Sequence, residues 1–197
     1  MSCTTLAAPA RFEMIVKNSR FRADAVAIDA PAQAMAFFAA VHDVSADHHC
    51  WAWRLGDNYR SCDDGEPAGT AGRPILAAID GAGCDRVAVL VARWFGGIKL
   101  GAGGLVRAYG GVAAQCLRLA QKTTWSKRTR TTVCCDFAHA GIIHQHLPRF
   151  DAVKQREAFA ADGLHLTIDL PCARLQELQA SLSDATRGRI RFLDDEP

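Results

Sequence analysis

The sequence predicts an α+β fold in two domains, over residues 1–122 and 123–197. Residues 86–95 form a nearly continuous apolar run, which is typical of a strand covered on both faces. From Gly104 to Leu119, apolar residues recur at helical spacing and mark a long helix with one buried face. After residue 122, short segments alternate between strand and helix patterns. Strands and helices are therefore mixed in both halves of the chain.

The elements of the first domain follow from local periodicity. Alternating or continuous apolar patterns predict strands at residues 12–17, 21–28, 49–55 and 86–95. Helices are predicted from Pro31, with Met35, Phe38 and Val41 on one face, and from Pro74 to Ile79. Proline suits the first helical position, where its missing N–H would have no partner anyway. The helix from Gly104 completes this domain.

The second domain is shorter and regular. Residues 122–130 are polar and basic, and we interpret them as a linker that could also contact RNA. Strands are predicted at 129–137, 152–160, 163–170 and 189–193, with helices at 140–149 and from Pro171. This βαββαβ order is the ferredoxin-like arrangement.

Composition excludes several classes of protein. A chain of 197 residues with 49% hydrophobic and 22% charged residues is globular. A net charge of +2 does not by itself indicate a nucleic-acid binder. The longest apolar stretch, Val87–Ala92, is far too short for a membrane span, and Met1–Arg11 lacks the features of a signal peptide. The eight cysteines contain no C-x-x-C pair, so we expect reduced thiols and a cytoplasmic location.

Residues 61–73 form a long loop with almost no hydrophobic side chain, and such loops are more often functional than connective. It places Asp63, Asp64 and Glu66 within four positions, where like charges repel unless cations lie among them. The loop either neutralises nearby Arg and Lys residues or, as a weaker candidate, holds a metal ion. We expect no cofactor.

Residues 93–107 leave the buried strand, turn through glycines and enter the long helix. Such a turn can expose N–H groups to a phosphate, with Lys99 and Arg107 adding charge at the same place, but glycine turns also serve close packing. His48 could be a hydrogen-bonded strand residue or a ligand. Phe95 and the nearby tryptophans could stack bases or fill the core.

Three segments resemble the IMPACT family, in its bacterial, YigZ-like branch. Asp63–Pro74 resembles the acidic-glycine motif of that family, and Arg93–Leu105 resembles its signature, which begins with Arg, two aromatics and two glycines. His48–Arg54 fits its His-containing strand. The resemblance is strong over residues 19–120. It implies a first domain like ribosomal protein S5 domain 2 and a second like the last domain of elongation factor G.

The resemblance implies a translation-linked regulatory factor that contacts RNA, the ribosome or a translation-associated protein, and no membrane. The alternative is a small-molecule or phosphate-binding enzyme, in which the acidic loop holds a cation and the glycine turn holds the anion. No nucleophile–base pair can be named, which favours the first reading. The predicted binding residues are His48, Asp63, Asp64, Glu66, Gly69, Thr70, Arg73, Arg93, Gly96, Gly97, Lys99, Gly101, Gly103, Gly104 and Arg107.

Overall fold

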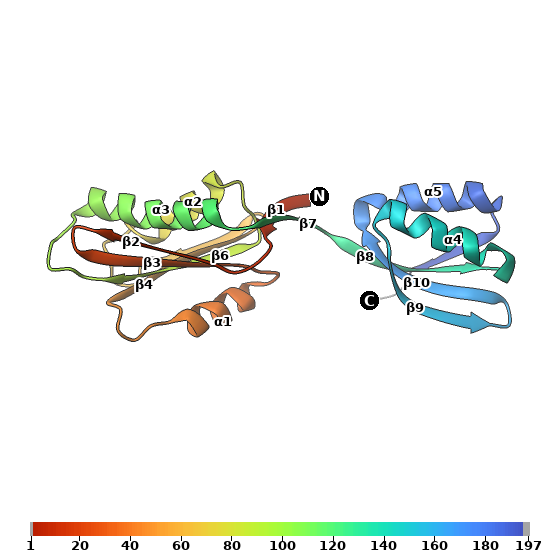
Figure 1. Ribbon diagram of the computed structural model, residues 1–197, viewed down its shortest axis with the longest axis horizontal. Coiled ribbons are helices and arrows are strands. Elements are labelled where there is room, and N and C mark those ends of the chain that lie inside the picture. Colours follow the sequence, from red (N-terminus) through yellow and green to blue (C-terminus); the bar gives the residue numbers. More distant parts are fainter. Residues whose placement is uncertain (1, 195–197) are drawn as a thin grey trace. The chain divides into compact units, whose positions relative to one another are not determined.

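The computed structural model describes residues 2–194. The chain forms two compact units, and the boundary between them in the sequence lies between Trp125 and Ser126. Each unit combines a sheet with helices on it and has a hydrophobic core of its own (Figure 1). The predicted α+β class is confirmed.

The first unit is built on a five-stranded antiparallel sheet in the order β2-β3-β6-β4-β5. Its strands are β2 (Ala10–Val16), β3 (Ser19–Ala27), β4 (His48–Leu55), β5 (Asn58–Cys62) and β6 (Val87–Trp94). Helices α2 (Gly72–Gly81) and α3 (Ala102–Leu119) cover one face, and α1 (Pro31–Val41) covers the other (Figure 1). The central strand β6 is therefore buried along nearly all of its length, which accounts for its continuous apolar sequence.

Helix α3 follows the predicted pattern except at its end. Leu105, Tyr109, Val112 and Cys116 are buried against the sheet. Leu119 was predicted on the same face but is 59% exposed, because it is the last residue of the helix and lies beyond the covered part. Met35 of α1 is also exposed, whereas Phe38 is buried as predicted.

The segment predicted as a linker, residues 122–130, contains the boundary between the two units, but it is formed almost entirely of strands. Strand β7 (Lys122–Ser126) pairs with β1 (Ser2–Leu6), and β8 (Arg128–Cys135) begins almost immediately afterwards. Trp125 lies under the Arg86 guanidinium, whose central carbon is 3.7 Å from the ring centre. Strand β7 pairs with a strand that lies more than a hundred residues earlier in the chain. The polar sequence of β7 therefore gave no local sign that it would pair.

The second unit has the predicted βαββαβ order. Its elements are β8, α4 (Ala140–His146), β9 (Val153–Ala160), β10 (Gly163–Pro171), α5 (Leu175–Thr186) and β11 (Ile190–Asp194). The strand order β11-β8-β10-β9 is that of the ferredoxin-like fold. Short 3₁₀ turns lie at Phe137–His139, Leu147–Phe150 and Cys172–Arg174, so α4 ends before residue 149 and α5 starts after Pro171.

The cysteines are free, and those at positions 50, 84, 116, 134 and 135 are buried. Burial raises the pKa of the Cys116 thiol to about 12, so this side chain packs as a small neutral group. Within residues 2–194, no helix combines the length and the apolar content needed to cross a membrane.

The two units are expected to fold separately, because each closes its own core. Residues 1–125 and 127–197, expressed as separate chains, should each give a cooperative thermal transition by circular dichroism. A chain ending at Gln121 lacks β7 and leaves β1 unpaired, so it should melt at a lower temperature than residues 1–125. An unfolded 1–125 fragment beside a stable intact chain would contradict independent folding.

Candidate functional site

A depression of about 470 Å³ opens in the first unit where three segments meet, and we call it the Glu66 pocket. These segments are the start of β4, the loop of residues 61–73 before α2, which we call the acidic loop, and the turn within residues 93–107 between β6 and α3, which we call the glycine turn. The pocket is lined by Asp47, His48, Glu66, Pro67, Arg93, Phe95, Lys99, Leu100, Gly101, Ala102 and Leu105.

A buried ion pair forms one wall of the pocket. Glu66 Oε1 accepts a hydrogen bond from Arg93 Nη1 at 2.6 Å and another from the Tyr109 hydroxyl at 2.7 Å. Burial raises the pKa of Tyr109 well above its ordinary value, so the phenol remains a donor. The Nε of Arg93 is also buried, and it has no hydrogen-bond partner within residues 2–194. The pair joins the acidic loop to β6 and α3.

Asp63 holds the acidic loop in shape. Its Oδ2 accepts the backbone N–H of Gly69 at 2.8 Å, and its Oδ1 accepts those of Ala71 at 3.0 Å and Gly72 at 2.8 Å. Burial acts to raise the pKa of Asp63, but these three donors and the charge of Arg73 outweigh it and lower the pKa. Asp63 therefore stabilises the loop and the start of α2 from within.

Asp64 contacts β4 and not the positive residues of the glycine turn. Its Oδ2 accepts the backbone N–H of His49 at 2.6 Å, and its carbonyl oxygen lies 2.8 Å from His48 Nδ1. Because a carbonyl only accepts, this contact places a proton on Nδ1 of His48. His48 Nε2 then faces Glu66 Oε1 at 4.0 Å. The three carboxylates thus have three different partners, and no group of three metal-ligating side chains occurs in the described chain.

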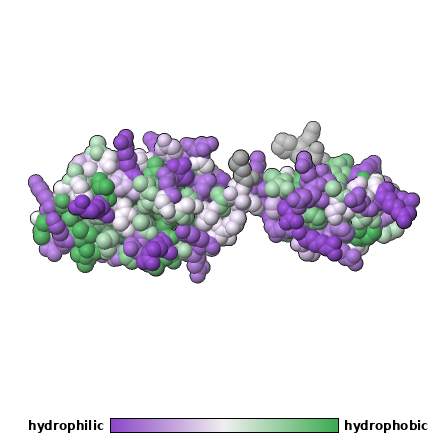
Figure 2. All heavy atoms as spheres, turned by 90° about the horizontal axis from the view of Figure 1, so that it is seen from above, coloured by the Kyte–Doolittle hydropathy of each residue, from purple (hydrophilic) through white to green (hydrophobic). Residues whose placement is uncertain are grey.

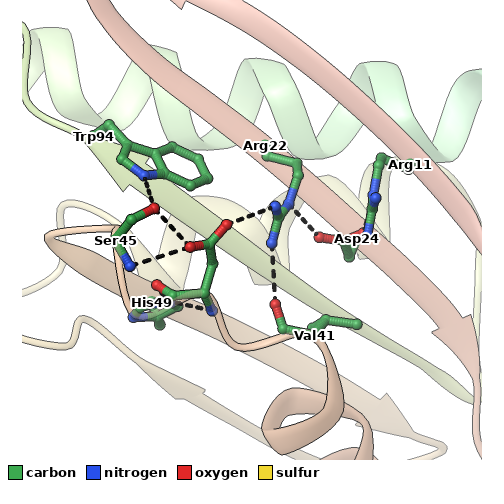
Figure 3. A network of polar contacts seen from close by, with 8 residues as sticks. Arg11, Arg22, Asp24, Val41, Ser45, His49 and Trp94 are labelled. Carbon is green, nitrogen blue, oxygen red and sulfur yellow. Dashed lines mark hydrogen bonds and ion pairs between the residues drawn. The ribbon is translucent and has the colours of Figure 1, made fainter.

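A polar network holds the loop that precedes His48 (Figure 3). Asp24, buried between Arg11 and Arg22, accepts hydrogen bonds from both at 2.6 and 2.9 Å. Arg22 also donates to the carbonyl of Val41 at 3.0 Å. This network connects the end of α1 to the sheet. It thereby positions the loop that leads to His48 at the pocket.

The same loop is tied to the end of β6. Trp94 Nε1 donates to Ser45 Oγ at 3.0 Å (Figure 3). Asp47 Oδ2 accepts the backbone N–H of Phe95 at 2.7 Å, and the N–H of Asp47 donates to the carbonyl of Arg93 at 2.9 Å. The carboxylate of Asp47 is thereby occupied, although it lines the pocket.

The glycine turn packs closely against the β2–β3 turn and leads into an uncapped helix start. A Cβ on Gly96 would lie 2.1 Å from the backbone carbon of Asn18, so this glycine allows close packing against the β2–β3 turn. Gly101, with φ of 70°, precedes α3, and no side chain caps the helix there. The first N–H groups of α3 have no partners within the helix, so they are available beside the exposed Lys99.

Other predicted residues lie away from the pocket lining. The N–H and hydroxyl of Thr70 donate to the carbonyl of Pro67, which closes the acidic loop. Arg73 is exposed and approaches Gly69. Arg107 lines a separate depression with Met14 and Lys17, so it does not share the place of Lys99 as predicted. Gly97, Gly103 and Gly104 are likewise absent from the lining.

Sequence reasoning missed the roles of Tyr109 and Asp47. Tyr109 was predicted only as a core residue of α3, and nothing in the pattern indicated that its hydroxyl meets Glu66. Asp47 immediately precedes His48, but its function depends on β6 lying beside β4. Both contacts join segments more than forty residues apart.

A wider depression of about 700 Å³ lies along α2 and α3. It is lined mainly by small apolar residues, including Ala77, Ala78, Ala82 and Gly110. Figure 2 looks onto this helical side, where pale and green atoms lie among purple hydrophilic side chains. With few convergent polar groups, this depression is a poorer candidate than the Glu66 pocket.

Comparison with known families gives two matches along the chain. The Impact N-terminal domain matches residues 17–117, and a domain of unknown function (DUF1949) matches residues 133–189. A Thermus thermophilus protein called "IMPACT family member in pol 5'region" is 44% identical, with 89% of this chain and 98% of the relative covered. The Escherichia coli protein "IMPACT family member YigZ" is 39% identical, with 95% of each chain covered.

A solved structure described as "Crystal structure of an hypothetical protein" is similar over both units. It has a TM-score of 0.69 and 36% sequence identity, and it covers 99% of this chain and 98% of its own.

Replacing Asp63 by Asn should destabilise the first unit, because an amide cannot accept all three N–H bonds. At neutral pH we expect the free energy of unfolding to fall by about 1.5–3 kcal/mol. The folded-state pKa of Asp63 is lowered, so its stabilisation is complete above the unfolded-state value of about 3.9 and is lost as the pH falls through the folded-state pKa. Urea unfolding at several pH values should show the difference between wild type and Asp63→Asn shrinking on acidification.

Asp64→Asn is the matched control for this measurement. The Asp64 side chain accepts one backbone N–H and is 48% exposed, so its replacement should cost clearly less. Equal losses for the two variants would show that the N–H bonds of Asp63 do not determine the stability of the loop.

Proposed function

The chain belongs to the IMPACT family, and on that basis we propose that it is a non-enzymatic, translation-linked cytoplasmic factor that contacts RNA through the Glu66 pocket. The observation that carries the proposal is that Lys99, which has no ion-pair partner within residues 2–194, lies in this pocket beside the uncapped start of α3. The carboxylates of the pocket are already engaged by the protein, whereas several of its donors are not.

Acidic residues would repel a nucleic-acid backbone if they were free. Glu66 is paired with Arg93, and Asp47 accepts a backbone N–H. Asp63 and Asp64 are bonded to backbone N–H groups outside the pocket lining. Lys99, in contrast, forms no ion pair within residues 2–194. In the lining, the charges of Arg93 and Lys99 balance those of Glu66 and Asp47, and Lys99 is the cation that no carboxylate of residues 2–194 pairs with, so an anion would bind beside Lys99.

The start of α3 also favours a phosphate. Its uncapped end directs N–H groups and the positive end of the helix dipole toward the region of Lys99 and Ala102. The unpartnered Nε of Arg93 adds no contact, because it is buried and therefore shielded from a ligand in the pocket.

An exposed aromatic at the same place favours RNA over a free phosphate. Phe95 lines the pocket and is 48% exposed, and the guanidinium carbon of Arg93 lies 5.5 Å from its ring centre. A base stacked on such a ring contributes about 1–3 kcal/mol without requiring a particular sequence. Phosphate and base would thus be bound by neighbouring groups, as in proteins that bind single strands.

The chemistry available supports a binding role. Cys50 and Tyr109 contact the acidic loop with potentially nucleophilic side chains, and burial raises the pKa of both. Each remains protonated and contacts the loop, through the carbonyl of Asp63 and through Glu66 respectively. They stabilise the site rather than attack a substrate.

The alternative is an enzyme acting on a small phosphorylated molecule. The pocket volume of about 470 Å³ is in the range of small-molecule sites, and His48 beside Glu66 could exchange a proton. The two functions predict different ligands for the same residues, so one set of variants distinguishes them.

Lys99→Ala should weaken binding to a short single-stranded oligouridine by about tenfold, since one charge-assisted contact is lost. The slope of log affinity against log salt should become shallower by about 0.7. Phe95→Ala should also weaken binding but leave the salt slope unchanged, because stacking releases no counterions. Fluorescence anisotropy at several salt concentrations measures both effects.

Arg107→Ala is the control, since it removes an exposed cation that lies outside the pocket. It should leave oligouridine affinity nearly unchanged, and all three variants should melt close to wild type. If Lys99→Ala and Phe95→Ala bind as wild type does, the pocket does not contact RNA. Thermal stabilisation by a mononucleotide that is lost in Lys99→Ala, without RNA binding, would favour the enzyme.

A further inference from the structure

The sheet of the second unit has one face that its own helices leave uncovered, and we call it the open face. Side chains at alternate positions, such as Val133, Leu166 and Ile168, pack with Ile143 of α4 and Leu178 of α5 in the core. Figure 1 shows both helices on the same side of the sheet. Because strand side chains alternate, the residues between the core positions lie on the open face.

The strand register arranges the open face in rows. One row contains Arg191, Cys134, His165 and Ala158, and the next contains Leu193, Thr132, Thr167 and Arg156. A third row contains Arg130 opposite Asp169. The face thus carries arginines from three of its four strands, with threonine and histidine side chains between them.

These arginines are available to a ligand. Arg130 and Arg156 are exposed and form no ion pair within the described residues. Arg191 is 73% exposed, and its contact with Asp162 is long, at 3.4 Å. A surface contact of this kind contributes little and is easily exchanged for another anion.

The described carboxylates near the open face have partners in the second unit. Asp169, in the third row, pairs with Arg128 at 3.2 Å. Asp162 lies 3.4 Å from Arg191 and accepts a hydrogen bond from His165 Nε2 at 3.0 Å, so it offsets part of the charge of Arg191. Arg130 and Arg156 have no such counter-charge among the described residues and leave this part of the face with an excess of positive charge.

We propose that the open face binds the phosphodiester backbone of single-stranded RNA, the choice of RNA resting on the function proposed above. Neighbouring strands are about 4.8 Å apart, so Arg191 on β11 and Arg156 on β9 lie roughly 14 Å apart across the sheet. One extended strand can meet several arginines over that width. Between these arginines, the hydroxyls of Thr132 and Thr167 are hydrogen-bonded to each other at 2.9 Å.

The chemistry predicts binding without sequence preference. Leu193 is 48% exposed, and the rows described above contain no Phe, Tyr or Trp; their one aromatic ring is the imidazole of His165, which is bonded to Asp162. Phosphate contacts therefore dominate, and their strength depends steeply on salt. The second unit thus supplies a salt-sensitive contact in addition to the one at the Glu66 pocket.

The test is a triple variant of the full chain, Arg130→Gln, Arg156→Gln and Arg191→Gln, titrated with the same single-stranded oligouridine. Three lost phosphate contacts should make the salt slope shallower by about 2 and weaken binding at low salt by about tenfold or more. Replacement of the same residues by Lys keeps the charge and should restore the slope. An unchanged slope in the Gln variant, with its melting temperature preserved, would overturn the proposal.

A matched control removes three positive charges elsewhere in the second unit: Arg149→Gln, Lys154→Gln and Arg174→Gln. Lys154 and Arg174 pair with Glu157 and Glu177, so this control should leave the salt slope close to that of wild type. An equal loss of slope in the control would show that net charge, and not the open face, determines binding.

The results for the open-face variant and for the pocket variant Lys99→Ala can be told apart. A slope that falls in the open-face variant but not in Lys99→Ala supports the open face and contradicts the pocket. The reverse result supports the pocket alone. If wild type does not bind oligouridine at low salt, both proposals fail.

Discussion

The buried pair between Glu66 and Arg93 is the interaction on which the first unit's site depends. It joins three parts of the chain, because the same carboxylate oxygen also accepts the hydroxyl of Tyr109. Removing one partner of a buried pair leaves an uncompensated charge and typically costs about 3–5 kcal/mol. The acidic loop, the central strand β6 and helix α3 are held together by this contact, and the pocket is the space that remains between them.

This arrangement explains why acidic and basic motifs occur together in the sequence. Asp63 stabilises its own loop through backbone N–H groups, Asp64 fixes the orientation of His48, and Glu66 neutralises Arg93. Glu66 thus lines the pocket, Asp63 and Asp64 support the loop outside the lining, and Lys99 is left in the pocket as a cation without an ion-pair partner in the described residues. The second unit uses a different geometry, since its exposed arginines stand on several strands of one sheet.

Local pattern predicted much of the fold and less of the site. The buried strand β6, the helix from residue 102 and the βαββαβ order are visible because their periodicity lies within single segments. Strands β1, β5 and β7 are short, and β1 pairs with β7 across most of the first unit, so no single segment reveals them.

Asp63 was expected to need a cation and instead uses backbone N–H groups, which depend on the shape of the loop and not on residue type. Lys99 and Arg107 likewise looked equivalent in sequence, but Lys99 precedes α3 and Arg107 lies within it, and the two residues line different depressions.

The pairing of β1 with β7 has a consequence for how such chains can be assembled. These strands are the first and last of the first unit, so the chain enters and leaves that unit at neighbouring positions. The carbonyl of Thr4 also accepts the N–H of Asp85, and Ala7 donates to the carbonyl of Gln121, so the junction is fastened to the unit itself. Domains whose ends lie close together tolerate insertion and recombination, because a neighbour can be exchanged without disturbing the core. The first unit is therefore built as a transferable module, to which a different companion could be joined at the same place.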